Sequence, residues 1–176
     1  MPQRMNYAAA APGGMKALGA VYGYVAQSGL PAALIELVYL RISQINGCAY
    51  CIDMHSRDLL KADVPVEKLV LVPAWDEAGL LFSSQEKAAL KWAEGVTRVS
   101  DTHVPEEAYV EARATFGEKE LADLTIAIGL MNAFNRLAIS FRATPLAAAP
   151  GTQSPRTQQM QGGGMKEAAL TGRTER

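Results

Sequence analysis

The chain lacks several features that would point to a specific function class. Its 17 basic and 18 acidic residues leave a net charge of -1, so no basic excess favours nucleic acid or an anionic membrane. No uninterrupted apolar run approaches the roughly 20 residues of a membrane span. Only two cysteines occur, and in a reducing cytosol such a pair is catalytic or metal-binding more often than structural.

A targeting segment is also missing. The stretch Arg4–Ala11 resembles the start of a signal peptide, but Pro12 and Lys16 break its apolar core too early. We therefore expect a cytoplasmic protein. The chain has 49% hydrophobic and 20% charged residues, an ordinary composition for one globular domain with its own core.

Almost every periodic segment predicts a helix. Apolar side chains recur at helical spacing in residues 15–28, 31–45, 48–62, 65–72, 83–98, 102–117 and 118–141. We expect an all-α domain of six or seven helices over residues 1–147. The last helix is apolar on much of its circumference, so it should be central or lie at a subunit interface. Residues 148–176 are expected to form a disordered or partner-docking tail.

The two cysteines stand close to one of the two histidines, in Cys48-Ala-Tyr-Cys51-Ile-Asp-Met-His55. On a helix, positions i, i+3 and i+7 share one face. Cα atoms three apart are separated by about 5 Å, within reach of a disulfide. Asn46 could cap this helix, and Cys48 in its first turn would then be favoured as a thiolate. His55 could exchange a proton with Cys51.

Glu36 is a carboxylate in an otherwise apolar stretch of the preceding helix. If the helices on either side of Gly47 run antiparallel, Glu36 lies about 16 Å and His55 about 12 Å from the turn. The two side chains could then meet, and the carboxylate would orient the imidazole and raise its basicity. The expectation fails if Glu36 points into solvent.

The segment Glu36–Ser56 resembles the alkylhydroperoxidase AhpD-like core of the carboxymuconolactone decarboxylase superfamily. That core has a Glu about a dozen positions ahead of Cys-x-x-Cys-x-x-x-His. Four residues match it: Glu36, Cys48, Cys51 and His55. Pro73–Trp75 and Asn132–Ile139 also resemble members of this family, and the resemblance covers about residues 4–143.

The resemblance implies an all-helical fold with a central Cys-x-x-Cys helix, assembled as homo-trimers or hexamers. It also implies a peroxidase cycle without a cofactor. Cys51 attacks an organic hydroperoxide and becomes a sulfenic acid, and Cys48 resolves it as a disulfide. A dithiol reductant, in some relatives a lipoylated protein, restores the thiols, while His55 and Glu36 relay protons.

One residue departs from the family pattern. Its best-characterised peroxidases carry a second His between the cysteines, where this chain has Tyr50. A Tyr hydroxyl forms hydrogen bonds but is a poor base near pH 7. A redox sensor or thiol-disulfide exchange protein with weak peroxidase activity is therefore the alternative function.

A second alternative is a metal-binding structural helix, because Cys, His and Glu are all zinc ligands. Three ligands on one continuous helix strain a tetrahedral site, however, and no second Cys pair completes it. Asn132 and Asn135, on the apolar last helix, are expected to make structural hydrogen bonds. Ser43 is expected to form a helix–helix hydrogen bond, and His103 to lie at the surface or in a cap.

Overall fold

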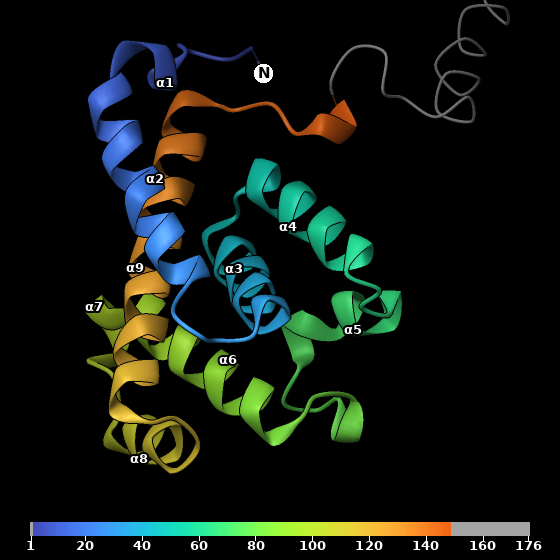
Figure 1. Ribbon diagram of the computed structural model, residues 1–176. Coiled ribbons are helices and arrows are strands. Elements are labelled where there is room, and N and C mark those ends of the chain that lie inside the picture. Colours follow the sequence, from blue (N-terminus) through green and yellow to red (C-terminus); the bar gives the residue numbers. More distant parts are fainter. Residues whose placement is uncertain (1, 149–176) are drawn as a thin grey trace, which may run out of the picture.

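Helices make up the regular secondary structure of residues 2–148, the part of the chain that the computed structural model describes (Figure 1). In this range the α-helices are α1 (Tyr7–Ala10), α2 (Pro12–Ala26), α3 (Ala32–Asn46), α4 (Ala49–Lys61), α5 (Val66–Leu71), α6 (Ser84–Thr97), α7 (Val99–Thr102), α8 (Glu106–Thr115) and α9 (Glu118–Phe141). Three short 3-10 helices join them: η1 (Val72–Ala74), η2 (Gly79–Leu81) and η3 (Leu146–Ala148).

The all-α prediction is confirmed. Every helix longer than one turn corresponds to a segment that periodicity predicted. Helices α1 and α7 have four residues each, too few to show a periodic pattern, so they were not expected. The tail expected over residues 148–176 lies outside the described residues, apart from Ala148.

Local sequence signals set most helix ends. Ser83 accepts a hydrogen bond from the Glu86 amide at 3.2 Å, and Glu86 accepts one from the Ser83 amide at 2.7 Å. This capping box starts α6 where the sequence predicted. Helix α2 begins at Pro12, earlier than expected, because Pro at the first helical position loses no hydrogen bond and has a preset φ.

Helix α3 lies at the centre of the packing and contacts α4, α6 and α9 (Figure 1). On one side, α2, α6, α8 and α9 enclose a hydrophobic cluster that contains Trp92. On the other, α4, α5, α6 and the 3-10 helices η1 and η2 enclose a second cluster that contains Trp75. Both clusters contain residues of α3. Because α3 is packed on both sides, its backbone is fixed and gives the side chains that project from it a defined position.

Helix α9 serves the core, as its apolar circumference predicted. It contacts α2, α3, α6 and α8, and Leu124, Ala127 and Ile128 on it are fully buried. The stretch Glu118–Ala148 is also long and apolar enough to span a membrane by length and composition, which the sequence analysis did not anticipate. A buried core helix meets the same criterion, and α9 packs one face on the core while Ile126 and Ile139 on it are exposed.

Candidate active site

The cysteines lie at the junction of α3 and α4. Their sulfurs form a disulfide, and their Cα atoms are 5.4 Å apart. Cys48 is the N-cap of α4, not part of its first turn as predicted, and its Sγ accepts a hydrogen bond from the Cys51 amide at 3.4 Å. Asn46 ends α3, and Gly47 follows in the left-handed region at φ 70°. Cys48 thus takes the capping role expected of Asn46, beside the positive end of the helix.

His55 lies one turn beyond Cys51 and is buried. Its Nδ1 is 2.7 Å from Oε2 of Glu36, which projects from α3. With the Glu36 oxygen as the acceptor, the Nδ1–H group of His55 donates this hydrogen bond. The predicted meeting of Glu36 and His55 across the hairpin therefore occurs, directly through their side chains.

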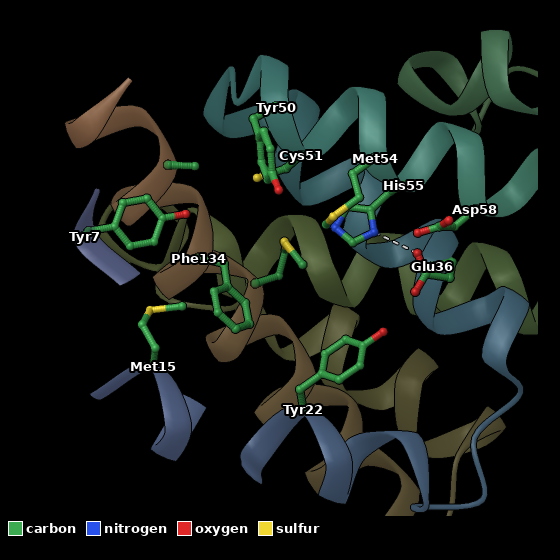
Figure 2. A pocket seen from close by; sticks show the side chains of 12 residues that line it. Tyr7, Met15, Tyr22, Glu36, Tyr50, Cys51, Met54, His55, Asp58 and Phe134 are labelled. Atoms are coloured by element: carbon green, nitrogen blue, oxygen red, sulfur yellow. Dashed lines mark hydrogen bonds and ion pairs between the residues drawn. The ribbon is translucent and has the colours of Figure 1, made fainter. Parts of the chain in front are cut away.

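The second ring nitrogen of His55, Nε2, is buried and has no hydrogen-bond partner among residues 2–148. Figure 2 shows the ring between Glu36 on one side and Cys51 on the other. Tyr39 packs against the ring with 5.3 Å between centroids and restricts its rotation. A neutral imidazole held in this way can accept a proton at Nε2 and return it.

A cavity of about 300 Å³ lies beside His55 and Cys51 (Figure 2). Cys51 lines it and Cys48 does not, so Cys51 is the sulfur that a molecule in the cavity meets. The wall is mostly apolar and aromatic, with Tyr7, Met15, Tyr22, Tyr50, Met54 and Phe134 among its residues. Most of these come from other helices than the motif.

The cavity also has an acidic side. Glu36 and Asp58 line it, and Asp58 accepts a hydrogen bond from Lys61 at 2.7 Å. Burial, and then the charges of Glu36 and Asp58, raise the pKa of the Tyr22 hydroxyl above its usual value of 10.0. Tyr22 therefore stays neutral at physiological pH and presents a hydroxyl donor near the carboxylates.

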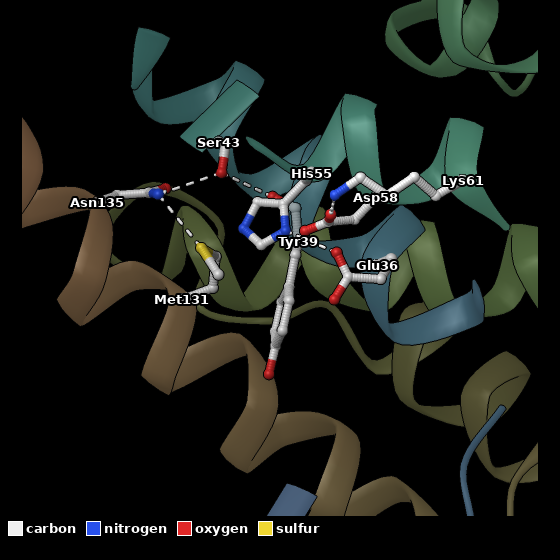
Figure 3. A network of polar contacts seen from close by, with 8 residues as sticks. All are labelled: Glu36, Tyr39, Ser43, His55, Asp58, Lys61, Met131 and Asn135. Atoms are coloured by element: carbon white, nitrogen blue, oxygen red, sulfur yellow. Dashed lines mark hydrogen bonds and ion pairs between the residues drawn. The ribbon is translucent and has the colours of Figure 1, made fainter. Parts of the chain in front are cut away.

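A polar network ties α3 and the cysteine turn to α9, and Figure 3 shows its part between Asn135 and Ser43. Asn46 donates to Oδ1 of Asn132 at 3.0 Å and to Oδ1 of Asn135 at 2.9 Å. Asn135 donates to Oγ of Ser43 at 3.1 Å, and Ser43 donates to the Tyr39 carbonyl at 2.7 Å. The structural roles predicted for Asn132, Asn135 and Ser43 are confirmed, and they hold the turn before Cys48 in place.

Residues 2–148 do not offer a set of ligands for zinc. No group of three or more His, Cys, Asp or Glu side chains in this range is arranged to hold a metal ion. His103, the other histidine, is the C-cap of α7 and is exposed, as expected. It does not line the cavity.

Most of the cavity wall was not predicted from the sequence, and the unpredicted residues that lie outside the cysteine helix include Tyr7, Met15, Tyr22 and Phe134. They belong to α1, α2 and α9 and have no regular spacing from the cysteine motif. Aromatic and Met residues on amphipathic helices usually indicate core, so no pattern in the sequence distinguishes them as cavity residues.

The profile of the Carboxymuconolactone decarboxylase family matches residues 12–95. The uncharacterized protein YdfG of Bacillus subtilis (strain 168) is 37% identical over 140 residues, which cover 80% of this chain and 95% of YdfG. The chain therefore belongs to the carboxymuconolactone decarboxylase family.

Solved structures place it in the AhpD-like group of that family. A protein of unknown function from Agrobacterium tumefaciens, described as a candidate antioxidant defence protein AhpD, has a TM-score of 0.79 at 38% identity, over 82% of this chain and 98% of that one. A peroxidase-related protein from Ralstonia eutropha JMP134 with an alkylhydroperoxidase AhpD core has a TM-score of 0.69 at 21% identity, over 79% and 74%. The second likeness concerns the fold alone.

Proposed function

We propose that the protein is a thiol-dependent peroxidase that reduces organic hydroperoxides through Cys48 and Cys51. The observation that carries the proposal is the arrangement of His55. Its Nδ1 is bonded to Glu36, its Nε2 has no partner within residues 2–148, and the residue lines the same cavity as Cys51. A carboxylate, an imidazole and a thiol in this order form an activated nucleophile.

The first step uses the reduced pair. His55 takes the Cys51 proton at Nε2, and the thiolate attacks the terminal oxygen of the hydroperoxide. The S–O bond forms as the O–O bond breaks, so Cys51 becomes a sulfenic acid and the organic part leaves as an alkoxide. His55 returns the proton to this alkoxide, which becomes an alcohol. Glu36 stabilises the imidazolium between the two proton transfers.

The second step closes the disulfide. The Cys48 sulfur attacks Cys51, the S–O bond breaks, and the hydroxyl leaves as water after taking a proton. The 5.4 Å separation of the Cα atoms supports a closure that leaves the helices in place. An external dithiol, with a lipoylated protein as the candidate, restores both thiols by exchange and is itself oxidised to a disulfide.

The shape of the cavity favours an organic substrate over hydrogen peroxide. About 300 Å³ of space with Met15, Tyr22 and Phe134 in its wall can enclose a small organic group and remove it from water. Hydrogen peroxide has no apolar part and gains nothing from this wall. We therefore expect a lower KM for cumene hydroperoxide than for hydrogen peroxide.

Peroxide titration of the reduced protein tests the proposal. One equivalent of cumene hydroperoxide should remove two thiols per wild-type chain without intermolecular crosslinks. Cys51→Ser should consume no peroxide, whereas Cys48→Ser should react once and stop at a sulfenic acid that dimedone traps. Full peroxide consumption by Cys51→Ser would show that Cys51 is not the attacking thiol.

Tyr50 in the position of a second His favours one other candidate, a redox sensor or thiol-exchange protein. Such a protein oxidises once and is regenerated slowly. Steady-state assays with cumene hydroperoxide and dihydrolipoamide separate the two functions. Many turnovers per chain support the peroxidase, and a single turnover followed by a stall supports the sensor.

A further inference from the structure

Two tyrosine hydroxyls point into the cavity beside the cysteine pair. Tyr50 lies between the cysteines on α4, and Tyr7 comes from α1, the first helix of the domain. Figure 2 shows both hydroxyls directed toward the space in front of Cys51. None of the hydrogen bonds within residues 2–148 uses either hydroxyl, so both can bond to a molecule in the cavity.

Tyr7 is held in this position by the end of α9. The Arg4 amide donates to the Phe141 carbonyl at 3.0 Å, and the Arg4 guanidinium donates to the Ser140 carbonyl at 2.9 Å. The Tyr7 and Phe141 rings pack with 5.6 Å between centroids. Asn6 accepts a hydrogen bond from the Ala9 amide and caps α1. These contacts with α9 therefore fix the position of Tyr7, although it lies near the start of the chain.

The Tyr7 hydroxyl is a hydrogen-bond donor at neutral pH. Burial, and then the neighbouring Tyr50, raise the pKa of the Tyr7 hydroxyl above its usual 10.0, so it keeps its proton. The Tyr50 side chain lines the same cavity, and a phenol can donate a hydrogen bond there. In an apolar cavity, a fixed neutral donor stabilises a developing negative charge more strongly than it would in water.

We propose that Tyr7 and Tyr50 form a phenol pair that donates hydrogen bonds to the leaving oxygen of the hydroperoxide. The inference rests on the proposed peroxidase function and adds to it two residues that contact the substrate. As the S–O bond forms, the electron pair of the O–O bond moves to the oxygen attached to the organic group. The phenols stabilise this charge, and His55 supplies the proton that neutralises it. Tyr50 then acts as a donor, which does not require a base.

The choice of oxidant tests this role. An organic hydroperoxide releases a strongly basic alkoxide, whereas peracetic acid releases a carboxylate that needs little stabilisation. The measurement is the single-turnover rate of thiol oxidation of the reduced protein by cumene hydroperoxide and by peracetic acid. Tyr7→Phe and Tyr50→Phe should each slow the reaction with cumene hydroperoxide by about 10- to 100-fold, the range for a lost oxyanion donor. The rate with peracetic acid should change by less than about 3-fold, since its leaving group is already stable.

Two controls separate this role from a structural one. Tyr109→Phe removes a hydroxyl from a tyrosine that packs on Trp92 outside the cavity, and it should leave both rates unchanged. Alkylation of Cys51 by iodoacetamide should proceed at the wild-type rate in Tyr7→Phe and Tyr50→Phe, because it needs no leaving oxygen in the cavity.

The inference is overturned if both Phe variants react at the wild-type rate with cumene hydroperoxide. It is also overturned if their rates of thiol oxidation fall by the same factor with both oxidants. A matching loss in alkylation would also overturn it, because the thiol itself would then be impaired. A wild-type protein that reacts with neither oxidant would refute the peroxidase function first and the phenol pair with it. The wild-type rates alone therefore distinguish the two failures.

Discussion

Glu36 and Glu94 are two carboxylates in similar surroundings with different basic partners. Their side chains are 19% and 23% exposed, and each bonds closely to a basic side chain. Glu36 lies 2.7 Å from Nδ1 of His55, and Glu94 accepts from Nε of Arg41 at 2.6 Å. Burial and charge therefore do not distinguish them.

The basic partner makes the difference. Arg41 is a permanent cation, and Trp75 donates to the same Glu94 oxygen at 2.8 Å. These hydrogen bonds link α3, α6 and the segment after η1, and Glu94 does not line the cavity beside Cys51. His55 can gain or lose a proton, and its Nε2 remains without a partner within residues 2–148. A carboxylate can take part in proton transfer when its basic partner lies at a cavity and still has a nitrogen that can accept a proton.

The largest effect is expected from Glu36→Gln. Gln can still accept from Nδ1 but does not stabilise a charged imidazolium, so kcat/KM for cumene hydroperoxide should fall about 100-fold. This corresponds to about 2.7 kcal/mol of transition-state stabilisation. The midpoint of urea unfolding should stay near the wild-type value. An unchanged rate together with a large loss of stability would instead make Glu36 a structural residue like Glu94.

Glu94→Gln should give the opposite pattern. The largely buried Arg41 loses its counter-charge, and we expect the free energy of unfolding to fall by about 1–2 kcal/mol, as for hydrogen bonds to charged groups. The kcat/KM of the folded protein should remain within about 2-fold of wild type, a change of under half a kcal/mol. Urea denaturation and peroxidase assays on the same preparation check both values. A 100-fold loss of activity in this variant would remove the distinction between the two carboxylates.

A third carboxylate, Asp123, extends the comparison with the smallest expected effect. Its oxygens accept from Lys119 at 2.6 Å and from the Tyr24 hydroxyl at 2.7 Å. The hydrogen bond from Lys119, and then that from Tyr24, lower the pKa of Asp123 below its usual 3.8. Because the native pKa is the lower one, this stabilisation is present above pH 3.8 and is lost as the pH falls through the native value.

Asp123→Asn should therefore reduce the fall in the free energy of unfolding at acid pH. Over the range from pH 7 to pH 2, the difference in urea midpoint between variant and wild type should narrow only as the pH falls below 3.8, while peroxidase activity at pH 7 stays unchanged. A constant difference across this range would mean that Asp123 contributes through packing and not through its charge.

Much of the fold was predictable because its signals are local. Periodicity located the seven longer helices, and the Ser83–Glu86 box set the start of α6. One of the two errors is local in origin and the other is tertiary. Pro12 extends α2 toward the N-terminus, and Cys48 takes the cap expected of Asn46, because the Asn46 side chain reaches α9 instead. A tertiary contact there overrides a local preference.

The site was predictable only in part. The spacing of Cys48, Cys51 and His55 places them on one helical stripe, and hairpin geometry adds Glu36. Neither argument reveals that Cys51 faces a cavity and Cys48 does not. The polar residues of α9 were expected to be structural, but their link to the cysteine turn through Asn46 needed the packed helices.

The sequence by itself determined the helices, the disulfide-capable cysteine pair and the order of carboxylate, imidazole and cysteine, because these depend on spacing along one or two adjacent helices. Only the tertiary structure decided what surrounds them. Tyr7, Tyr22 and Phe134 come from α1, α2 and α9, and they line the same cavity as Cys51 because α1 packs on α2, α2 on α9 and α9 on α3. Side chains that meet only through packing leave no regular spacing in the sequence, and half of the residues that line this cavity are of that kind.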